Sequence, residues 1–240
     1  MPAFLVHGVP DTASLWDGVR SRLTRSDVIA PNLPGFEAPI PDGFGATKEE
    51  YAEWLVAEVE NVGEPVDLVG HDWGSILVQR VVSLRPDLIR TWACGSGPVD
   101  RDYVWHEMAQ LWQTPKVGEQ VMQAMQGDAI VAALEGEVGR ERAVEMAAHI
   151  DDTMKDCILK LYRSAKDGFG EWHDAVDAIT RPGLVFWGNN DPYVTGEFGE
   201  RLSERTSARL VLFDDSGHWW PVTKPEVVAR ELESLWSSAG

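Results

Sequence analysis

Residues 68–76, which read LVGHDWGSI, constrain the fold of this chain more than any other stretch. A short apolar run at 65–69 leads into Gly70, and a second glycine, Gly74, opens an amphipathic run. This order predicts a buried strand, a sharp turn and a helix, with Asp72 at the tip of the turn. Such a turn strains its central residue and needs glycines where the strand and the helix approach closely. We therefore expect Asp72 at the carboxyl edge of a sheet, where ligands bind in α/β folds.

Strands and helices alternate on both sides of this turn. Helical periodicity marks residues 48–60, 76–84 and 225–236. Alternation of this kind favours an α/β fold, with a mostly parallel central sheet flanked by helices. The predicted strands are residues 4–6, 28–30, 66–69, 88–93, 184–187 and 209–213.

The alternation stops between residues 100 and 178. This stretch is rich in Trp, Met and Ala at helical spacing, with breaks at Pro115, Gly127 and Gly136. It predicts an inserted helical cap at 100–178, with the core formed by residues 1–99 and 179–240. The first apolar run follows Met1 almost at once, so we expect a shortened N-terminus that starts inside the first core strand.

Composition excludes several classes of partner. The 240 residues carry 21 basic and 39 acidic side chains, and the net charge of -18 disfavours nucleic acids and anionic membranes. No apolar run reaches the length of a membrane span, and no signal-peptide pattern occurs. Cys94 and Cys157 are expected to be buried free thiols, which fits a cytoplasmic location. The expected partner is a small apolar molecule, and the expected state is a monomer or homodimer.

Two more polar residues follow predicted strands. Asp191 lies in WGNNDP after the strand at 184–187, and His218 lies in DSGHWW after the strand at 209–213. A nucleophile needs a base, and the base needs an acid that orients it. The chain order Asp72, Asp191, His218 therefore predicts nucleophile, acid and base.

The loop after the first strand reads His7-Gly8-Val9-Pro10. A turn there can direct the backbone N–H of Val9 towards the site, beside the N–H of Trp73. Two converging amides form an oxyanion hole. His7 is expected to hold the loop in place rather than to react.

Together these motifs resemble the α/β-hydrolase superfamily, and specifically its aspartate-nucleophile branch. The resemblance rests on His-Gly-x-Pro, Leu33-Pro34-Gly35-Phe36, Gly-His-Asp-Trp-Gly, Gly-x-x-Asp-Pro and Gly-His, and it covers nearly the whole chain. That branch contains epoxide hydrolases and haloalkane dehalogenases. The resemblance implies the α/β-hydrolase fold, with a cap inserted after the strand that ends near Ala93, and no cofactor.

A carboxylate nucleophile favours reaction at saturated carbon. Attack on an acyl carbon would give a reactive mixed anhydride, whereas displacement at an sp³ carbon gives an ordinary alkyl ester on Asp72. Water activated by His218 can then hydrolyse this ester. The hypothesis is thus a cofactor-independent hydrolase that acts through a covalent alkyl ester.

The cap leaves the substrate open. Tyr162, in Leu-Tyr-Arg, resembles the second ring-opening tyrosine of epoxide hydrolases, which favours conversion of an apolar epoxide to a diol. Epoxide hydrolases usually have another tyrosine in the first half of the cap, and Trp112 stands near that place here. Tyr103 is the only tyrosine nearby, and its position does not match. Haloalkane dehalogenase is the alternative, with Trp73 as halide ligand and Trp105 or Trp112 as the second. The expected substrate-binding residues are Trp73, Trp105, Trp112, Tyr103 and Trp219.

Two other classes stay open: a non-hydrolytic tailoring enzyme that uses Asp72 as a base, and a catalytically silent ligand-binding member of the fold. No metal site is expected, because no paired cysteines or His-x-x-x-His spacing occurs. The stretches 106–107 and 149–152, which carry lone histidines beside acids, are interpreted as solvated helix faces.

Overall fold

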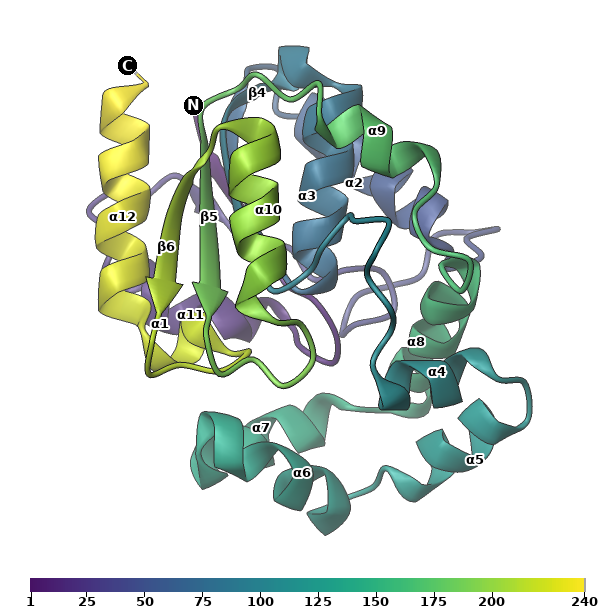
Figure 1. Cartoon of the computed structure of the whole chain (residues 1–240). Coiled ribbons are helices and arrows are strands. Elements are labelled where there is room, and N and C mark those ends of the chain that lie inside the picture. Colours follow the sequence, from purple (N-terminus) through teal and green to yellow (C-terminus); the bar gives the residue numbers. More distant parts are fainter. Residues whose placement is uncertain (240) are drawn as a thin grey trace.

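One parallel sheet organises the protein in this computed structural model, which describes residues 1–239 (Figure 1). Each strand pairs in parallel with its neighbours. The predicted α/β class is confirmed, and β4 extends past the predicted end at residue 93. In spatial order the strands are β2 (Val28–Ile29), β1 (Ala3–Val6), β3 (Val66–His71), β4 (Ile89–Gly95), β5 (Gly183–Gly188) and β6 (Arg209–Phe213).

Helices flank the sheet, as predicted. α2 (Lys48–Glu60) packs on α3 (Trp73–Leu84), while α1 (Asp17–Arg20) packs on α12 (Pro225–Ser238). Among residues 1–239, no helix combines the length and the apolar character that crossing a membrane requires. The other helices of the core are η1 (Ala13–Trp16), η2 (Pro86–Leu88), α10 (Gly196–Thr206) and α11 (Trp220–Thr223).

Local sequence explains where α2 begins. The Thr47 side chain accepts a hydrogen bond from the Glu50 backbone N–H, and the Glu50 carboxylate accepts one from the Thr47 backbone N–H at 3.0 Å. This reciprocal capping box satisfies two amides that a helix start otherwise leaves unpaired. Tyr51, Leu55 and Val59 then share the buried face of the helix.

The strands β1 and β3 are buried along their whole length. Such continuous burial is expected for parallel strands covered by helices on both faces. Asp67 is the buried charge within β3, and it is fully paired: it accepts hydrogen bonds from Arg25 (2.8 Å), Arg90 (2.8 Å) and Thr91 (2.7 Å). This network lies at the amino end of β3, so it stabilises the sheet at the opposite end from Asp72.

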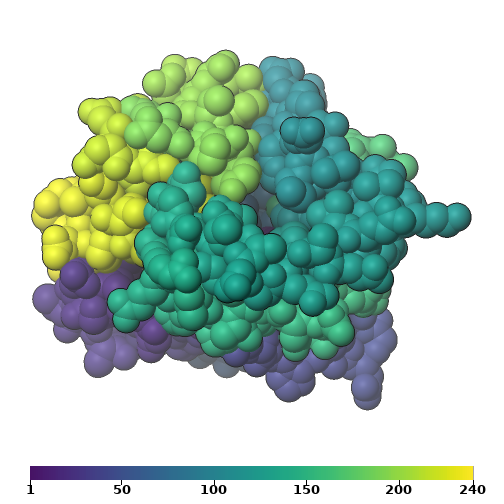
Figure 2. All heavy atoms as spheres, turned by 90° about the horizontal axis from the view of Figure 1, so that it is seen from below, coloured from purple at the N-terminus to yellow at the C-terminus, as the bar shows by residue number. Residues whose placement is uncertain are grey.

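The segment between β4 and β5 is helical, as its periodicity predicts. Figure 1 shows α4–α8 beyond the arrowheads of the strands, and Figure 2 shows teal atoms of this segment spread across the same end of the molecule. α9, which the sequence assigns to the cap, packs against α3 of the core. The helices are α4 (Glu107–Gln113), α5 (Val117–Ala124), α6 (Asp128–Val138), α7 (Arg140–His149), α8 (Asp152–Ser164) and α9 (Glu171–Val176).

Candidate active site

Asp72 occupies the turn between β3 and α3 with a backbone φ of 55°. Both flanking glycines are required by packing: a Cβ on Gly70 would lie 2.2 Å from the Gly74 carbonyl oxygen, and a Cβ on Gly74 would lie 2.2 Å from the carbonyl oxygen of Val6. Although Asp72 holds the N-cap position of α3, its side chain makes no capping bond. The turn therefore presents the carboxylate away from the helix.

The two carboxylate oxygens of Asp72 have different neighbours. Oδ1 accepts a hydrogen bond from the backbone N–H of Val9 at 2.6 Å. Oδ2 lies 3.5 Å from Nε2 of His218. The loop after β1 and the loop after β6 thus meet at the tip of the turn, as the sequence predicts.

Asp191 holds His218 from the other side. Its Oδ2 lies 2.8 Å from Nδ1 of the imidazole, and its Oδ1 accepts hydrogen bonds from the N–H groups of Tyr193 (2.9 Å) and Val194 (3.0 Å). The carbonyl of His218 accepts a bond from Nε2 of His71 at 2.8 Å. Both the ring and the backbone of His218 are therefore fixed in place.

Charge favours an imidazolium at this position. Burial lowers the pKa of His218, but the charges and hydrogen bonds of Asp191 and Asp72 outweigh it and raise that pKa to about 10. Burial raises the pKa of the Asp191 carboxyl, but the charge and hydrogen bond of His218 outweigh it and lower that pKa below its ordinary value. At neutral pH, His218 is therefore a cation between two carboxylates.

His7 has the supporting position expected of it. Its Nδ1 donates to the Gly8 carbonyl at 2.8 Å, and its Nε2 accepts from the Leu33 backbone N–H at 2.9 Å. Burial lowers its pKa to about 4, so the ring is neutral. Since both nitrogens are bonded to backbone, His7 holds the Val9 loop and is not free to react.

These histidines predict that the protein is most stable near pH 6.5. Burial lowers the pKa of His7 to about 4 and of His71 to about 3, so the unfolded chain binds protons more tightly and stability falls as pH drops below 6.5. His218 has the opposite sign: its raised pKa stabilises the folded state below pH 6.5, and this contribution is lost as pH rises towards 10. Thermal melts at pH 5, 6.5 and 9 measure this profile. A melting temperature that rises from pH 6.5 to 9 would contradict it.

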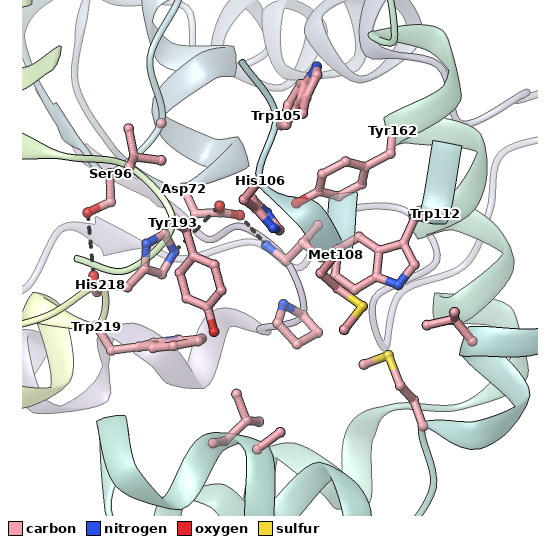
Figure 3. A pocket seen from close by; sticks show the side chains of 18 of the residues that line it. Asp72, Ser96, Trp105, His106, Met108, Trp112, Tyr162, Tyr193, His218 and Trp219 are labelled. Carbon is pink, nitrogen blue, oxygen red and sulfur yellow. Dashed lines mark hydrogen bonds and ion pairs between the residues drawn. The ribbon is translucent and has the colours of Figure 1, made fainter. Parts of the chain in front are cut away.

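A cavity of about 400 Å³ lies over Asp72 (Figure 3). Its polar groups gather near Asp72 and His218, whereas α5 and α6 line it with apolar side chains. Among the described residues that form its wall, none is a lysine or an arginine. The apolar side chains from α5, α6 and the turn between them are Val121, Ala124, Met125, Ala129, Ile130, Ala133 and Leu134.

Tyr162 enters this cavity from α8, where the sequence places it. In Figure 3 its hydroxyl points from the wall towards Asp72. Burial and the charge of Asp72 raise the pKa of the phenol well above 10. The hydroxyl is therefore protonated at neutral pH and can donate a hydrogen bond into the cavity.

Trp105, Trp112 and Trp219 line the cavity as expected, but their indole N–H groups do not serve it. Trp105 donates to the Ala165 carbonyl at 3.0 Å, and Trp219 donates to Asp11 at 2.8 Å. The Trp112 nitrogen is buried without a partner, and Figure 3 shows it directed away from Asp72. These residues offer ring surfaces rather than hydrogen bonds. Tyr103 also lines the cavity.

The expectation that Trp73 lines the substrate pocket needs correction. Trp73 is fully buried and lies outside the cavity wall. Trp105 stacks on it with ring centroids 5.6 Å apart, and Tyr162 meets it edge-on at 5.3 Å. Trp105, in the segment before α4, and Tyr162 of α8 therefore pack against its ring.

Two further residues of the wall were missed or misassigned. His106, interpreted as part of a solvated helix face, lines the cavity at the start of α4. Tyr193 also lines it, and its ring centroid lies 5.1 Å from that of His218. The proximity of Tyr193 to Asp191 in sequence could have identified it. His106 had no such signal, because its position depends on how the inserted helices fold back.

A buried ion pair ties the inserted helices to the core. Arg142 of α7 donates to Asp11 at 3.1 Å, and Asp11 also accepts the Trp219 indole bond. Asp11 follows the Val9 loop, and Trp219 follows His218. The pair therefore joins α7 to both loops that contact Asp72, and it neutralises the guanidinium of Arg142.

At the end of α9, ligand atoms of His173, Asp174 and Asp177 lie close enough together to hold a metal ion. The carboxylates already have cationic partners. Arg101 pairs with Asp174, and Arg205 bonds Asp177 at 2.6 Å. We assign this cluster to the surface ion pairs of the protein.

Known proteins place this arrangement in a family. The profile of the alpha/beta hydrolase family matches residues 3–231. (E)-2-((N-methylformamido)methylene)succinate hydrolase of Acinetobacter baylyi is 23% identical over 242 residues, which are 97% of this chain and 89% of that protein. Epoxide hydrolase 4 of Mus musculus is 23% identical over 256 residues, 93% of this chain and 69% of that protein. The crystal structure of haloalkane dehalogenase DbeA from Bradyrhizobium elkani USDA94 shares the fold, with a TM-score of 0.80, 22% identity and coverage of 99% and 91%. Because the family profile spans nearly the whole chain, this protein belongs to the alpha/beta hydrolase family.

Proposed function

We propose that this protein is an epoxide hydrolase that opens an apolar epoxide through an alkyl ester on Asp72 and releases a diol. One observation carries the proposal: the Tyr162 hydroxyl and the Asp72 carboxylate face the same apolar cavity, with His218 beside the carboxylate (Figure 3). This combination supplies a nucleophile, a hydrogen-bond donor for the oxygen that leaves, and a base. The similarity to epoxide hydrolase 4 supports it.

In the first step, Oδ2 of Asp72 attacks a ring carbon of the epoxide. The C–O bond breaks, and its electron pair stays on the epoxide oxygen, which takes a proton from Tyr162. Oδ1 remains on the Val9 N–H and becomes the carbonyl oxygen of the ester. The ester forms without any proton transfer to or from His218.

In the second step, water attacks the ester carbonyl. Negative charge develops on Oδ1 of Asp72, where the N–H of Val9, with that of Trp73, forms the proposed oxyanion hole. Formation of the ester has removed the charge of Asp72, which is one cause of the raised pKa of His218. The pKa of His218 therefore falls, and the ring gives its proton to the Tyr162 phenolate that the first step leaves. The neutral ring can then take a proton from water, while Asp191 stabilises the imidazolium that forms.

The cavity favours a neutral substrate. Part of its wall is formed by apolar side chains of α5 and α6, which stabilise apolar groups by removing them from water. The cation in the wall, His218, already lies between the carboxylates of Asp72 and Asp191, and Arg142 of α7 is paired with the buried Asp11. A substrate carboxylate would enter without a counter-charge, at a free-energy cost of several kcal/mol.

Haloalkane dehalogenation is the second candidate, and one observation favours it. Among the described residues, the buried Trp73 N–H has no hydrogen-bond partner, although this side chain follows the proposed nucleophile directly. A halide is held well by such a donor. Against this reading, Trp105 and Trp219 donate their indole N–H groups elsewhere, so they supply no second donor.

Tyr162→Phe distinguishes the two candidates. We expect the rate of diol formation from styrene oxide to fall by roughly 10²-fold or more, because the departing oxygen loses its proton donor. Diol is measured by chromatography, and bromide release from 1-bromobutane is measured in parallel. Trp73→Phe is the matched variant, since it removes the N–H that a halide would use. Bromide release that persists in Tyr162→Phe but disappears in Trp73→Phe would establish dehalogenation instead.

A further inference from the structure

His106 caps α4 with one ring nitrogen and leaves the other for the cavity. Nδ1 accepts a hydrogen bond from the Ala109 backbone N–H at 3.3 Å. Since Nδ1 is the acceptor, the neutral ring carries its proton on Nε2. The ring lines the same cavity as Asp72 and Tyr162. The hydrogen bond at the start of α4 thus selects the tautomer whose Nε2–H is available to a ligand.

The ring lies at the reacting end of this cavity. Figure 3 shows His106 between Asp72 and Tyr162 in that view. The Trp112 ring contacts both donors, with its centroid 4.9 Å from that of Tyr162 and 6.2 Å from that of His106. Tyr193, which packs on His218, lies 5.0 Å from His106 on the other side. The imidazole and the phenol therefore approach the space over Asp72 from neighbouring positions.

The surroundings keep this ring neutral. Burial is the largest effect on the pKa of His106 and lowers it. The cationic His218 lowers this pKa further, and the charges of Asp72 and Asp191, which raise it, are too weak to compensate. The phenols of Tyr103, Tyr162 and Tyr193 share the cavity wall and are uncharged at neutral pH. A neutral imidazole can stabilise a developing oxyanion through its N–H without giving up the proton.

Tyr162 alone is a weak acid for this reaction. Burial and the charge of Asp72 raise the pKa of its phenol, so transfer of the proton to a departing oxygen is less favourable than for an ordinary phenol. An epoxide oxygen has two lone pairs, and the phenol uses one of them. A second donor at the other lone pair would carry part of the charge while the C–O bond breaks.

We propose that His106 is a catalytic residue whose Nε2–H donates a hydrogen bond to the epoxide oxygen beside Tyr162. This inference rests on the proposed epoxide hydrolase function. As Oδ2 of Asp72 bonds to carbon, the electron pair of the broken C–O bond stays on oxygen, which takes the Tyr162 proton and keeps the His106 hydrogen bond. After the ring opens, the imidazolium of His218 returns a proton to the Tyr162 phenolate. Hydrolysis of the ester then consumes one water, and the proton that it releases restores the imidazolium. His106 keeps its proton throughout.

Two substitutions separate donation from helix capping. His106→Asn keeps a short side-chain acceptor for the Ala109 N–H but is too short to replace Nε2–H. His106→Gln places an amide N–H near the position of Nε2 and loses the favourable cap. The rate of ester formation on Asp72 is measured by intact mass after rapid mixing with styrene oxide, in a His218→Gln background that allows the ester to accumulate. Melting temperatures report the effect on folding.

We expect His106→Asn to slow ester formation about 10- to 100-fold, and His106→Gln to recover part of that loss. His149→Gln is the matched control: this histidine lies on α7, pairs with Glu37 and does not line the cavity, so the rate should stay unchanged. An unchanged rate in His106→Asn, or a slower rate in His106→Gln than in His106→Asn, would overturn the role of His106 alone. If the His218→Gln parent forms no ester, the proposed function fails, and this inference fails with it.

Discussion

Replacing Asp72 with asparagine is expected to reduce diol formation by roughly 10⁴-fold or more. The amide keeps an oxygen for the Val9 N–H and tolerates the φ of 55°, so the turn should fold as before. It is not nucleophilic, so no ester can form. Diol production from styrene oxide measures the loss, and intact mass verifies that asparagine is still present after the assay.

Heavy-oxygen water tests the same residue without a substitution. A single turnover should place one labelled oxygen in the peptide that contains Asp72, because water attacks the ester carbonyl rather than the substrate carbon. The peptide with Asp191 is the internal control and should stay unlabelled. An active enzyme with an unlabelled Asp72 would contradict the covalent pathway and favour a tailoring reaction in which Asp72 is a base. Labelling would also exclude a silent binding protein.

Replacing His218 with glutamine is expected to trap the ester. Only Asp72 is needed for the first step, so one equivalent of styrene oxide should add to the protein, while hydrolysis slows roughly 10²- to 10⁴-fold. Intact mass should increase by the mass of one substrate molecule. Digestion should locate the adduct on the peptide that contains Asp72.

The pH dependence of the unsubstituted enzyme supplies an independent check on His218. Hydrolysis needs the neutral ring. The ester lacks the charge of Asp72, so its His218 has a pKa below the resting value of about 10, but Asp191 still favours the protonated ring. Hydrolysis of the ester should therefore accelerate as pH rises, and more ester should be present at pH 6 than at pH 9. Equal amounts at both pH values would show that His218 is not the base of the second step.

The parallel sheet explains why the three proposed catalytic side chains could be located from sequence. Asp72, Asp191 and His218 each follow a predicted strand, and parallel strands end at one edge of a sheet. The contacts of 2.8 Å and 3.5 Å at His218 are a consequence of that shared edge. Likewise, the glycines around Asp72 imply the sharp turn because any larger residue would overlap neighbouring backbone.

The inserted helices were harder to predict. Their apolar spacing indicates that they are helices, but many packings of α4–α8 bury the same faces. The position of Trp73 under Trp105 and Tyr162, and of His106 in the cavity wall, depends on which packing forms. The buried pair of Arg142 and Asp11 also joins segments that are distant in the chain.

Local pattern by itself therefore determined the α/β class, the sharp turn and the loops that carry Asp72, Asp191 and His218. These features depend on backbone geometry and on residues close together in sequence. Tertiary structure alone decided that Tyr162 faces Asp72, that Trp73 is covered and that Arg142 pairs with Asp11. Those features depend on contacts between distant segments, whose packing energies no single stretch of sequence reveals.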